Sequence, residues 1–458
     1  MKRHLPNFVL AAKGVKITRL ESIMNKRFFL VTLLSAALVL VSAPGIIGAQ
    51  SQPLAGKEVS FLTTFGGSEL DAMNKSLDAF TKATGILVTV ESNRQSMPIL
   101  RTRLAGGNPP DLALIPQPGT LAAFVKAGQV KALVNKDGSA GLVDKKTLTD
   151  NYNQAIIDLG TVNGAVYAIL AKANSKSTIW YKPASFKTLG VDIPKTWDDL
   201  IAIQNKYIAA GKTPWSIGAG DSWTLTDWFE EIYVRQNGAD MYQKLFATHE
   251  IKWTDPSVAK ALTAFKQIVS PADKNLTGGI DGTLATSFID GVNLVFRPDA
   301  KAELYYEGGF MGGIIAQNFP KLTPVTDFNA FMFPAFDSKI GTPDEIGGDL
   351  LAAFADRPEV REFVKWMAGT DGNTLWAKTG AIVSPNKNVP LSTYSPLGAI
   401  DAGQVAGATV SVFDGSDQMP PDASQAMSTG LQDFIRNPDN MAKIQQTIED
   451  AAAKAYGS

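Results

Sequence analysis

Aromatic and acidic residues gather in one short stretch of the sequence, DSWTLTDWFEE (221–231), which contains Trp223, Asp227 and Trp228. A flat indole ring packs well against the C–H face of a sugar ring, and a neighbouring carboxylate accepts strong hydrogen bonds from ring hydroxyls. This pairing predicts a site for a hydroxyl-rich molecule, although core packing is the commoner role of any single Trp. Further candidates with the same chemistry are Trp180, Tyr306 and Glu307.

Two loops that follow predicted strands offer backbone and polar groups. Because ligands of open α/β sheets bind at the carboxyl ends of the strands, we expect both loops to face a ligand. Ser68 with Asp71 also resembles a capping box, so a helix cap explains Ser68 equally well. The loops contribute the candidate residues Phe65, Gly66, Ser68, Glu69 and Gln117.

The residues that most enzyme and metal sites need are missing. The chain has no cysteine and two histidines, which excludes thiolate sites and multi-histidine metal sites, and it lacks the common nucleophile, phosphate-loop and zinc motifs. We therefore expect no catalytic residue, metal or cofactor. A net charge of −1 gives no electrostatic footprint for nucleic acid.

A glycosidase stays open as an alternative, because it needs only two carboxylates. Asp227, Glu230, Glu231 and Glu307 are available, and an exposed helix face is the other explanation of Glu230 and Glu231.

Alternating strands and helices must position these residues. Apolar β-rich runs at 59–63 and 86–90 flank an amphipathic helix over 68–80, and a third strand is expected at 111–115. A βαβ unit of this kind implies parallel strands and a right-handed crossover. With 458 residues, 45% of them hydrophobic, the chain can form more than one core. We predict an α/β fold with two lobes.

The first 49 residues predict a secretory signal peptide. Lys26 and Arg27 precede an apolar run, and small residues follow up to a cleavage site at Ala49. Met24 is an alternative start, because the signal is complete without residues 1–23. A single membrane anchor is the alternative interpretation of the apolar run. The mature protein is expected to be exported.

Seven stretches, in order along the chain, carry a resemblance to a known family. The stretches are NPPDLALIPQPG (108–119), PKTWDDL (194–200), GKTPWSIG (211–218), TDWFEEIYVR (226–235), DRPEVREFVKWMA (356–368), WAKTGAIVSPN (376–386) and FDGSDQMP (413–420). With them the chain resembles the family 1 extracellular solute-binding proteins of ABC importers, and within them the carbohydrate-binding branch that includes α-glucoside binders.

The resemblance implies a periplasmic-binding-protein-like fold, type II-like, with a ligand cleft between two lobes. Lobe one would comprise 57–170 plus 334–385, and lobe two 171–333 plus 386–458. It implies a periplasmic monomer that captures a carbohydrate by cleft closure and delivers it to the permease subunits. Retention by a lipid anchor is not expected, because no lipobox cysteine is present.

Carried over to this sequence, the family's ligand contacts fall mostly on residues already singled out. They are Ser68, Glu69, Gln117, Trp223, Asp227, Trp228, Glu307, Gly309, Phe310, Gly348 and Asp349. Near the C-terminus the family often has a Gly-x-Phe-Trp segment, whereas this chain has SQAMSTGLQDF (424–434), which leaves the exact sugar open. A non-sugar solute, such as a polyamine or a phosphate ester, is the other alternative. Arg94, Arg101 and Arg103 would suit a phosphate ester, although a solvated helix face is the expected role of these arginines.

Overall fold

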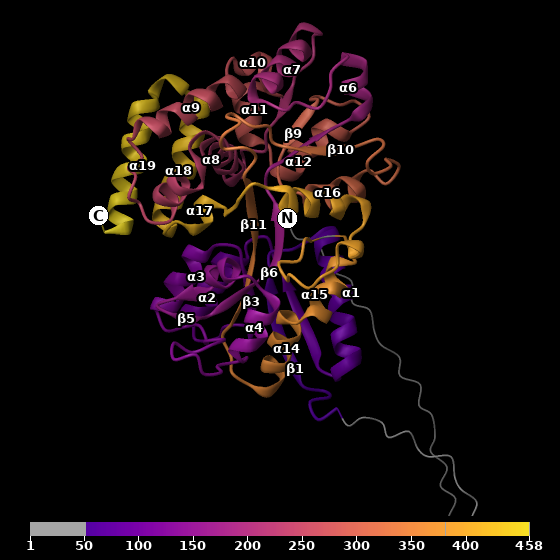
Figure 1. Ribbon diagram of the computed structural model, residues 1–458, viewed down its shortest axis with the longest axis vertical. Helices are drawn as coiled ribbons and strands as arrows, with labels where there is room; N and C mark the ends of the chain where they lie inside the picture. Colours follow the sequence, from indigo (N-terminus) through magenta and orange to yellow (C-terminus); the bar gives the residue numbers. More distant parts are fainter. Residues whose placement is uncertain (1–51, 381, 458) are drawn as a thin grey trace, which may run out of the picture. The chain divides into compact units, whose positions relative to one another are not determined.

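Two β-sheets, each covered by helices, organise the residues that the computed structural model describes, which are 52–380 and 382–457 (Figure 1). The expected signal peptide, residues 1–49, lies outside them. We call the larger sheet with its helices lobe one and the smaller sheet with its helices lobe two. The two-lobed α/β fold expected from the sequence is confirmed, whereas the residue boundaries given for the lobes stay a prediction.

The larger sheet has the strand order β12-β11-β3-β1-β2, and β6 pairs with β11 as well. β1 pairs in parallel with β2 and with β3, as the predicted βαβ unit requires, while β11 runs antiparallel to β3 and β6. The carboxyl ends of β1 and β3 therefore meet at one edge, which faces lobe two. The strands are β1 (Glu58–Thr63), β2 (Leu87–Ser92), β3 (Leu112–Ile115), β6 (Ala168–Ser175), β11 (Asp344–Ala353) and β12 (Ser411–Phe413).

The smaller sheet has the order β10-β7-β9-β8. Only Lys176 and Ser177 separate the end of β6 from the start of β7, so one nearly continuous extended segment runs from the first sheet into the second. The strands of this sheet are β7 (Thr178–Tyr181), β8 (Trp215–Ser216), β9 (Leu304–Tyr306) and β10 (Asn329–Met332), and a small hairpin elsewhere joins β4 (Thr161–Val162) to β5 (Ala165–Val166).

Helices of lobe one bury apolar stripes against the larger sheet. In α1 the stripe is Met73, Leu77 and Phe80, and Gly85 ends the helix in the left-handed conformation. The capping box expected at Ser68 is wrong: Gly66 is the N-cap and makes no side-chain cap, and Ser68 lies inside the first turn. The helices are α1 (Gly67–Thr84), α2 (Ser96–Ala105), α3 (Pro118–Lys126), α4 (Lys145–Asn151), α5 (Gln154–Leu159), α14 (Pro358–Ala368) and α15 (Thr370–Ala377).

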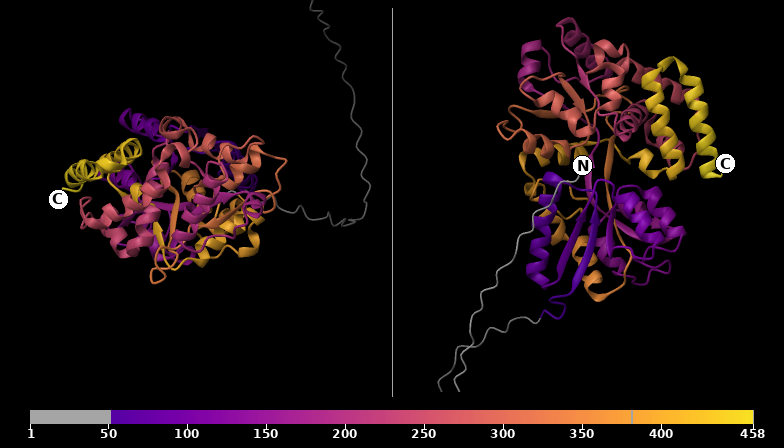
Figure 2. Two further views of the ribbon diagram at one scale, coloured as in Figure 1. Left: turned by 90° about the horizontal axis from the view of Figure 1, so that it is seen from above. Right: turned by 180° about the vertical axis from the view of Figure 1, so that it is seen from behind.

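Lobe two is richer in helices, which surround its sheet on both sides (Figure 2). α7 begins with a complete capping box, in which Thr196 and Asp199 satisfy each other's backbone N–H groups. The helices are α6 (Pro183–Leu189), α7 (Trp197–Ala209), α8 (Trp223–Phe246), α9 (Pro256–Val269), α10 (Ala272–Asn275), α11 (Gly279–Ala285), α12 (Phe288–Phe296), α13 (Met311–Asn318), α18 (Pro421–Arg436) and α19 (Met441–Tyr456).

The last part of the chain returns to the junction between the two sheets. β12 hydrogen-bonds to β11 in the larger sheet, yet Val412 of β12 packs into the apolar core of lobe two. The short elements here are η1 (Leu391–Thr393), α16 (Pro396–Gly407), α17 (Gly415–Gln418) and η2 (Pro438–Asn440). Among the described residues, no helix combines the length and the apolar character that a membrane crossing needs.

Candidate ligand-binding cleft

A cleft of about 570 Å³ lies between the two lobes. Lobe one lines it with the loops that follow β1, β2 and β3, which are the carboxyl ends of its parallel strands. Lobe two lines it with the first residues of α8, α12 and α13 and with the segment from β12 to α18. This location follows the general rule for open α/β sheets.

Several residues singled out in the sequence line this cleft together, although their numbers are far apart. They are Phe65, Glu69, Gln117, Trp223, Phe310, Gly348 and Asp349. Folding therefore brings the β1–α1 loop, the β3–α3 loop, β11 and the start of α8 to one place.

The other candidates lie away from the cleft lining. Trp180, Asp227, Trp228, Tyr306 and Glu307 are each at most 1% exposed. The indole of Trp228 packs against Trp215 and Tyr306, and Trp180 donates its ring N–H to the carbonyl of Glu307 at 3.2 Å. Ser68 and Gly309 line a separate cavity of about 80 Å³, and Gly66 lies beside the guanidinium of Arg94.

Four rings form the apolar part of the cleft. The ring centroids of Trp223 and Phe288 lie 5.2 Å apart, and the Phe310 ring is 6.3 Å from Trp223. These three rings come from the starts of α8, α12 and α13 in lobe two, and Phe65 faces them from lobe one. The separations are those of favourable tilted aromatic pairs, so the wall is held by its own packing.

Lys172 forms a charged network at the lobe-one end of the cleft. Its Nζ lies 2.6 Å from a carboxylate oxygen of Glu69 and 3.8 Å from Asp349, and it sits 4.4 Å above the Phe65 ring. Burial alone would raise the pKa of Glu69, but Lys172 and Arg94 outweigh it and lower that pKa. Asp349 has weaker partners, and its burial raises its pKa to about 6.

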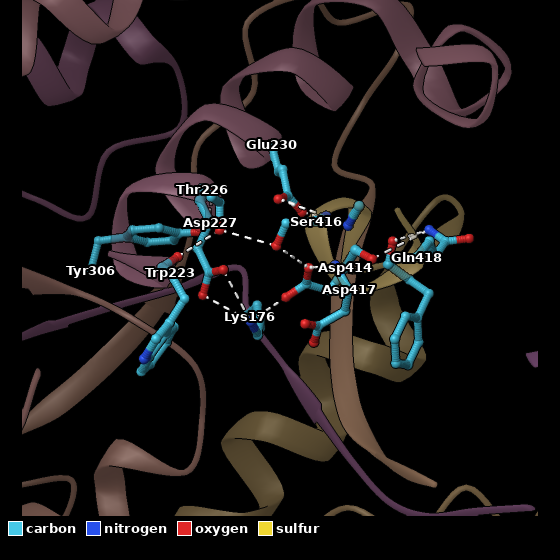
Figure 3. A network of polar contacts seen from close by, with 12 residues as sticks. Lys176, Trp223, Thr226, Asp227, Glu230, Tyr306, Asp414, Ser416, Asp417 and Gln418 are labelled. Atoms are coloured by element: carbon cyan, nitrogen blue, oxygen red, sulfur yellow. Dashed lines mark hydrogen bonds and ion pairs between the residues drawn. The ribbon is translucent and has the colours of Figure 1, made fainter. Parts of the chain in front are cut away.

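Lys176 forms a second network at the lobe-two end (Figure 3). Its Nζ contacts Asp414, lies 3.0 Å from Asp227 and sits 5.2 Å from the ring centroid of Trp223. Burial raises the pKa of Asp227 to about 7, whereas Lys176 overcomes burial at Asp414 and lowers the pKa of that carboxyl. Asp414 therefore carries the charge that neutralises Lys176. Asp227 supports the ammonium from behind.

Further carboxyl groups are buried behind Lys176, and they correct one expectation. Glu230 and Glu231, expected on a solvated helix face, have no exposed surface. Glu230 accepts hydrogen bonds from the backbone N–H groups of Gly415 and Ser416 at the start of α17. Glu231 pairs with Arg235, and its burial raises its pKa to about 7. The Ser177 hydroxyl also donates to Glu231 at 3.0 Å, so these two acids hold α8 to α17 and to the segment between β6 and β7.

Carboxylate oxygens of Asp227, Glu345 and Asp414 lie within 4.8 Å of one another, a grouping that suits a cation. The ammonium of Lys176 already contacts two of the three. The chain's own lysine therefore supplies the cation at this point.

Sequence reasoning missed both lysines and did not place Arg94 and Arg101 at the cleft, although Arg101 is exposed on α2 as expected. Lys172 and Lys176 stand in the run AILAKANSKSTIWY (168–181), whose other residues are mostly small or apolar. A four-residue spacing in a strand places both side chains on one face, and this was the available signal. Arg94 and Arg101, expected on a solvated helix face, line the cleft, and Arg94 lies 3.5 Å from Glu69.

Comparison with known proteins shows the family and the fold of this chain. A family model described as bacterial extracellular solute-binding protein matches residues 66–374. The osmoprotective compounds-binding protein GgtB of Synechocystis sp. is 32% identical over 92% of this chain and 99% of that protein. The alpha-glucosides-binding periplasmic protein AglE of Rhizobium meliloti is 32% identical over 82% of this chain and 83% of that protein.

Solved structures share the fold at low sequence identity. The bacterial solute receptor AcbH superposes with a TM-score of 0.76 at 20% identity, covering 87% of this chain and 99% of that chain. RafE in complex with raffinose gives a TM-score of 0.70 at 18% identity, covering 87% and 99% of the two chains. The resemblance seen in the sequence is thus confirmed, and the chain belongs to the family of bacterial extracellular solute-binding proteins.

Proposed function

We propose that this protein captures a carbohydrate, an α-glucoside or an oligosaccharide, in the periplasm and delivers it to the permease of an ABC importer. One relative supports the ligand class through its name, a binder of α-glucosides, and the name of another gives osmoprotective compounds as its ligands. Membership of an extracellular solute-binding family supports a location outside the cytoplasm, and the name of AglE supports the periplasm and the proposed transport role.

The observation that carries the proposal is the placement of Trp223. Its indole lines the cleft beside Phe288 and Phe310, and the ammonium of Lys176 lies 5.2 Å from its ring centroid. A sugar offers both kinds of surface, because its C–H face suits the rings and its hydroxyls suit the charges. Trp223 is the residue we expect to stack on a pyranose ring.

The charged networks suit hydroxyl groups because each offers donors and acceptors side by side. Glu69, Asp349 and Asp414 have lone pairs for ligand O–H groups, and the ammonium groups of Lys172 and Lys176 donate. A neutral polyol could satisfy these groups without bringing an unpaired charge.

Capture would then proceed by population shift between an open and a closed arrangement of the lobes. A ligand that touches both walls binds the closed arrangement more tightly and so increases its population. Closure excludes water, and hydrogen bonds to the ligand strengthen in the drier cleft. The buried residues Asp227, Trp228 and Tyr306 support this wall from behind.

A thermal-shift screen tests the ligand class. We expect sucrose, trehalose or maltose to raise the melting temperature, because a ligand that binds only the folded state stabilises it, by about 2.7 kcal/mol at a hundred times Kd. Spermidine and glycine betaine serve as non-sugar comparisons. If only these raise the melting temperature, the carbohydrate proposal fails. Recovery of glucose from an incubated disaccharide would instead favour the glycosidase alternative.

One observation favours a second ligand class, an anionic solute such as a phosphate ester. Arg94 and Arg101 both line the cleft rather than facing away from it. Glucose 6-phosphate separates the two classes. Under the main proposal it should bind no more tightly than the neutral disaccharides, because Glu69, Asp349 and Asp414 repel its charge.

A further inference from the structure

The two lobes touch at one edge of the cleft through bare backbone. Gly119, in the first turn of α3 in lobe one, faces Met419, which directly follows α17 in lobe two. A Cβ built on Gly119 would lie 2.1 Å from the carbonyl oxygen of Met419 and 3.1 Å from that of Gln418. Real Cβ atoms do not come within 3.0 Å of such atoms, so a side chain here is incompatible with the contact.

The backbone opposite Gly119 is firmly held in lobe two. Met419 is 1% exposed, and its N–H donates to the carbonyl of Gly415 at 3.2 Å. The Met419 side chain packs in the apolar core of lobe two, and Glu230 of α8 accepts hydrogen bonds from the backbone N–H groups of Gly415 and Ser416 at the start of α17. Since this segment cannot retreat by itself, relief of a clash requires the lobes to move apart.

The conformation of Gly119 itself does not call for glycine. It is helical, it follows Pro118 at the start of α3, and it is not among the residues with positive φ. Alanine is the better helix former at such a position. Within lobe one alone, therefore, nothing penalises Gly119→Ala. The glycine is required only by the contact between lobes.

This contact stands directly beside the proposed ligand site. Gln117, two residues before Gly119, hydrogen-bonds to Asp417, and both residues line the cleft. At another contact between the lobes, the backbone N–H of Ser68 in α1 donates to Oε1 of Gln317 in α13 at 3.1 Å. These are two of the places at which the lobes are in contact.

We propose that Gly119 is a positioning residue that sets how closely the lobes approach, and thereby how tightly a captured ligand is enclosed. The role of Gly119 in the approach of the lobes is independent of the proposed function. Its effect on how tightly a ligand is enclosed rests on the proposed carbohydrate capture. With Gly119→Ala the gap to the Met419 oxygen must widen from 2.1 Å to at least 3.0 Å. The open arrangement gains relative to the closed one, and a ligand that needs both walls leaves faster.

Distances between spin labels measure this directly, because the chain has no cysteine of its own. Labels on Lys126→Cys in α3 and Thr429→Cys in α18, both exposed, report the separation of the lobes. The test compares the otherwise unchanged protein with Gly119→Ala, and Gly403→Ala is the matched control. Gly403 is also helical, and a Cβ there meets nothing within 4 Å.

Without any saccharide, we expect the doubly labelled but otherwise unchanged protein, the parent, to show a population of molecules with a short distance between the labels. Gly403→Ala should keep this short-distance population, and Gly119→Ala should lose it. All three proteins should melt at similar temperatures. With sucrose, trehalose or maltose, that population should grow in the parent, and Gly119→Ala should bind the same sugar about tenfold more weakly. An unchanged short-distance population in Gly119→Ala, or its absence from the parent under every condition, overturns the proposal. If no saccharide changes the short-distance population of the parent, the result counts against carbohydrate capture. The comparison without ligand still decides the role of Gly119.

Discussion

Two tryptophans five positions apart show how environment decides the role of a residue. Trp223 begins α8 and lines the cleft, whereas Trp228 lies one turn later in the apolar core and is 1% exposed. Both have the same ring chemistry, and both follow from the same local pattern. Burial separates a ligand-facing ring from a structural one.

Alanine substitution should separate these two roles. We expect Trp223→Ala to abolish detectable saccharide binding while the melting temperature of the free protein changes little. Trp228→Ala should lower the free energy of unfolding by about 3–5 kcal/mol, because it leaves a large cavity. Isothermal titration and urea unfolding measure the two effects. Normal affinity in Trp223→Ala would remove it from the site.

Asp401 of α16 gives a prediction about pH. Its carboxylate accepts the backbone N–H of Ser175 at 2.6 Å, and burial raises its pKa to about 8. At pH values between the ordinary pKa of an aspartate and about 8, Asp401 holds a proton in the folded protein and releases it in the unfolded chain. The stability from this group is complete at acidic pH and is lost as pH rises towards 8.

Asp401→Asn keeps the acceptor for Ser175 but cannot titrate. From pH 5 to pH 8 we expect the melting temperature of the unmodified protein to fall by about 3 °C more than that of the variant. Calorimetry across this range measures the difference. Parallel curves would show that Asp401 is already ionised in the folded protein at pH 5.

At the scale of elements, β6 has an unusual composition for a strand at the centre of the protein. It is buried along its whole length, and it carries Lys172 and leads into Lys176. The strand tolerates both because carboxylates from α1, α8, β11 and the β12–α17 turn surround their ammonium groups. Burying a charge is acceptable only with such partners.

Removing one ammonium should therefore be costly in a pH-dependent way. Lys176→Met leaves Asp227 and Asp414 without a cation, and we expect a loss of about 3–5 kcal/mol in the free energy of unfolding at pH 7.5. At pH 5 the loss should be smaller, because the orphaned carboxyls take up protons in the folded state. Lys176→Arg keeps the charge and serves as the control. Equal losses at both pH values in urea unfolding would contradict this account.

At the scale of the whole molecule, the two lobes share chain segments rather than a single linker. The segment from β6 to β7 belongs to both sheets, and β12 is bonded to the larger sheet while Val412 packs in lobe two. Unfolding either lobe thus removes contacts from the other.

We therefore expect residues 52–458 to unfold in one cooperative transition. A single calorimetric peak, with calorimetric and van't Hoff enthalpies that agree, is the expected result. A saturating saccharide should move that peak upward without splitting it. Two resolved peaks in the absence of ligand would show that the lobes unfold independently.

Local sequence signals predicted the elements well wherever a pattern was strong. The βαβ unit from β1 to β2 and the apolar stripe of its helix α1 both follow from periodicity. These features depend on neighbours along the chain. The Ser68 cap failed because Gly66 already occupies the capping position of α1.

The sequence by itself determined the alternation of strands and helices and the family, and it predicted loops that the structure places at the cleft. Hydrophobic periodicity and turn residues act over a few positions, so one sequence suffices to recognise them. Only the tertiary structure decided which charged side chains are buried and paired. Lys172 meets Glu69, and Lys176 meets Asp414, across more than a hundred and two hundred positions of chain respectively. The same holds for Gly119, whose requirement comes from a backbone three hundred residues away that no local pattern describes.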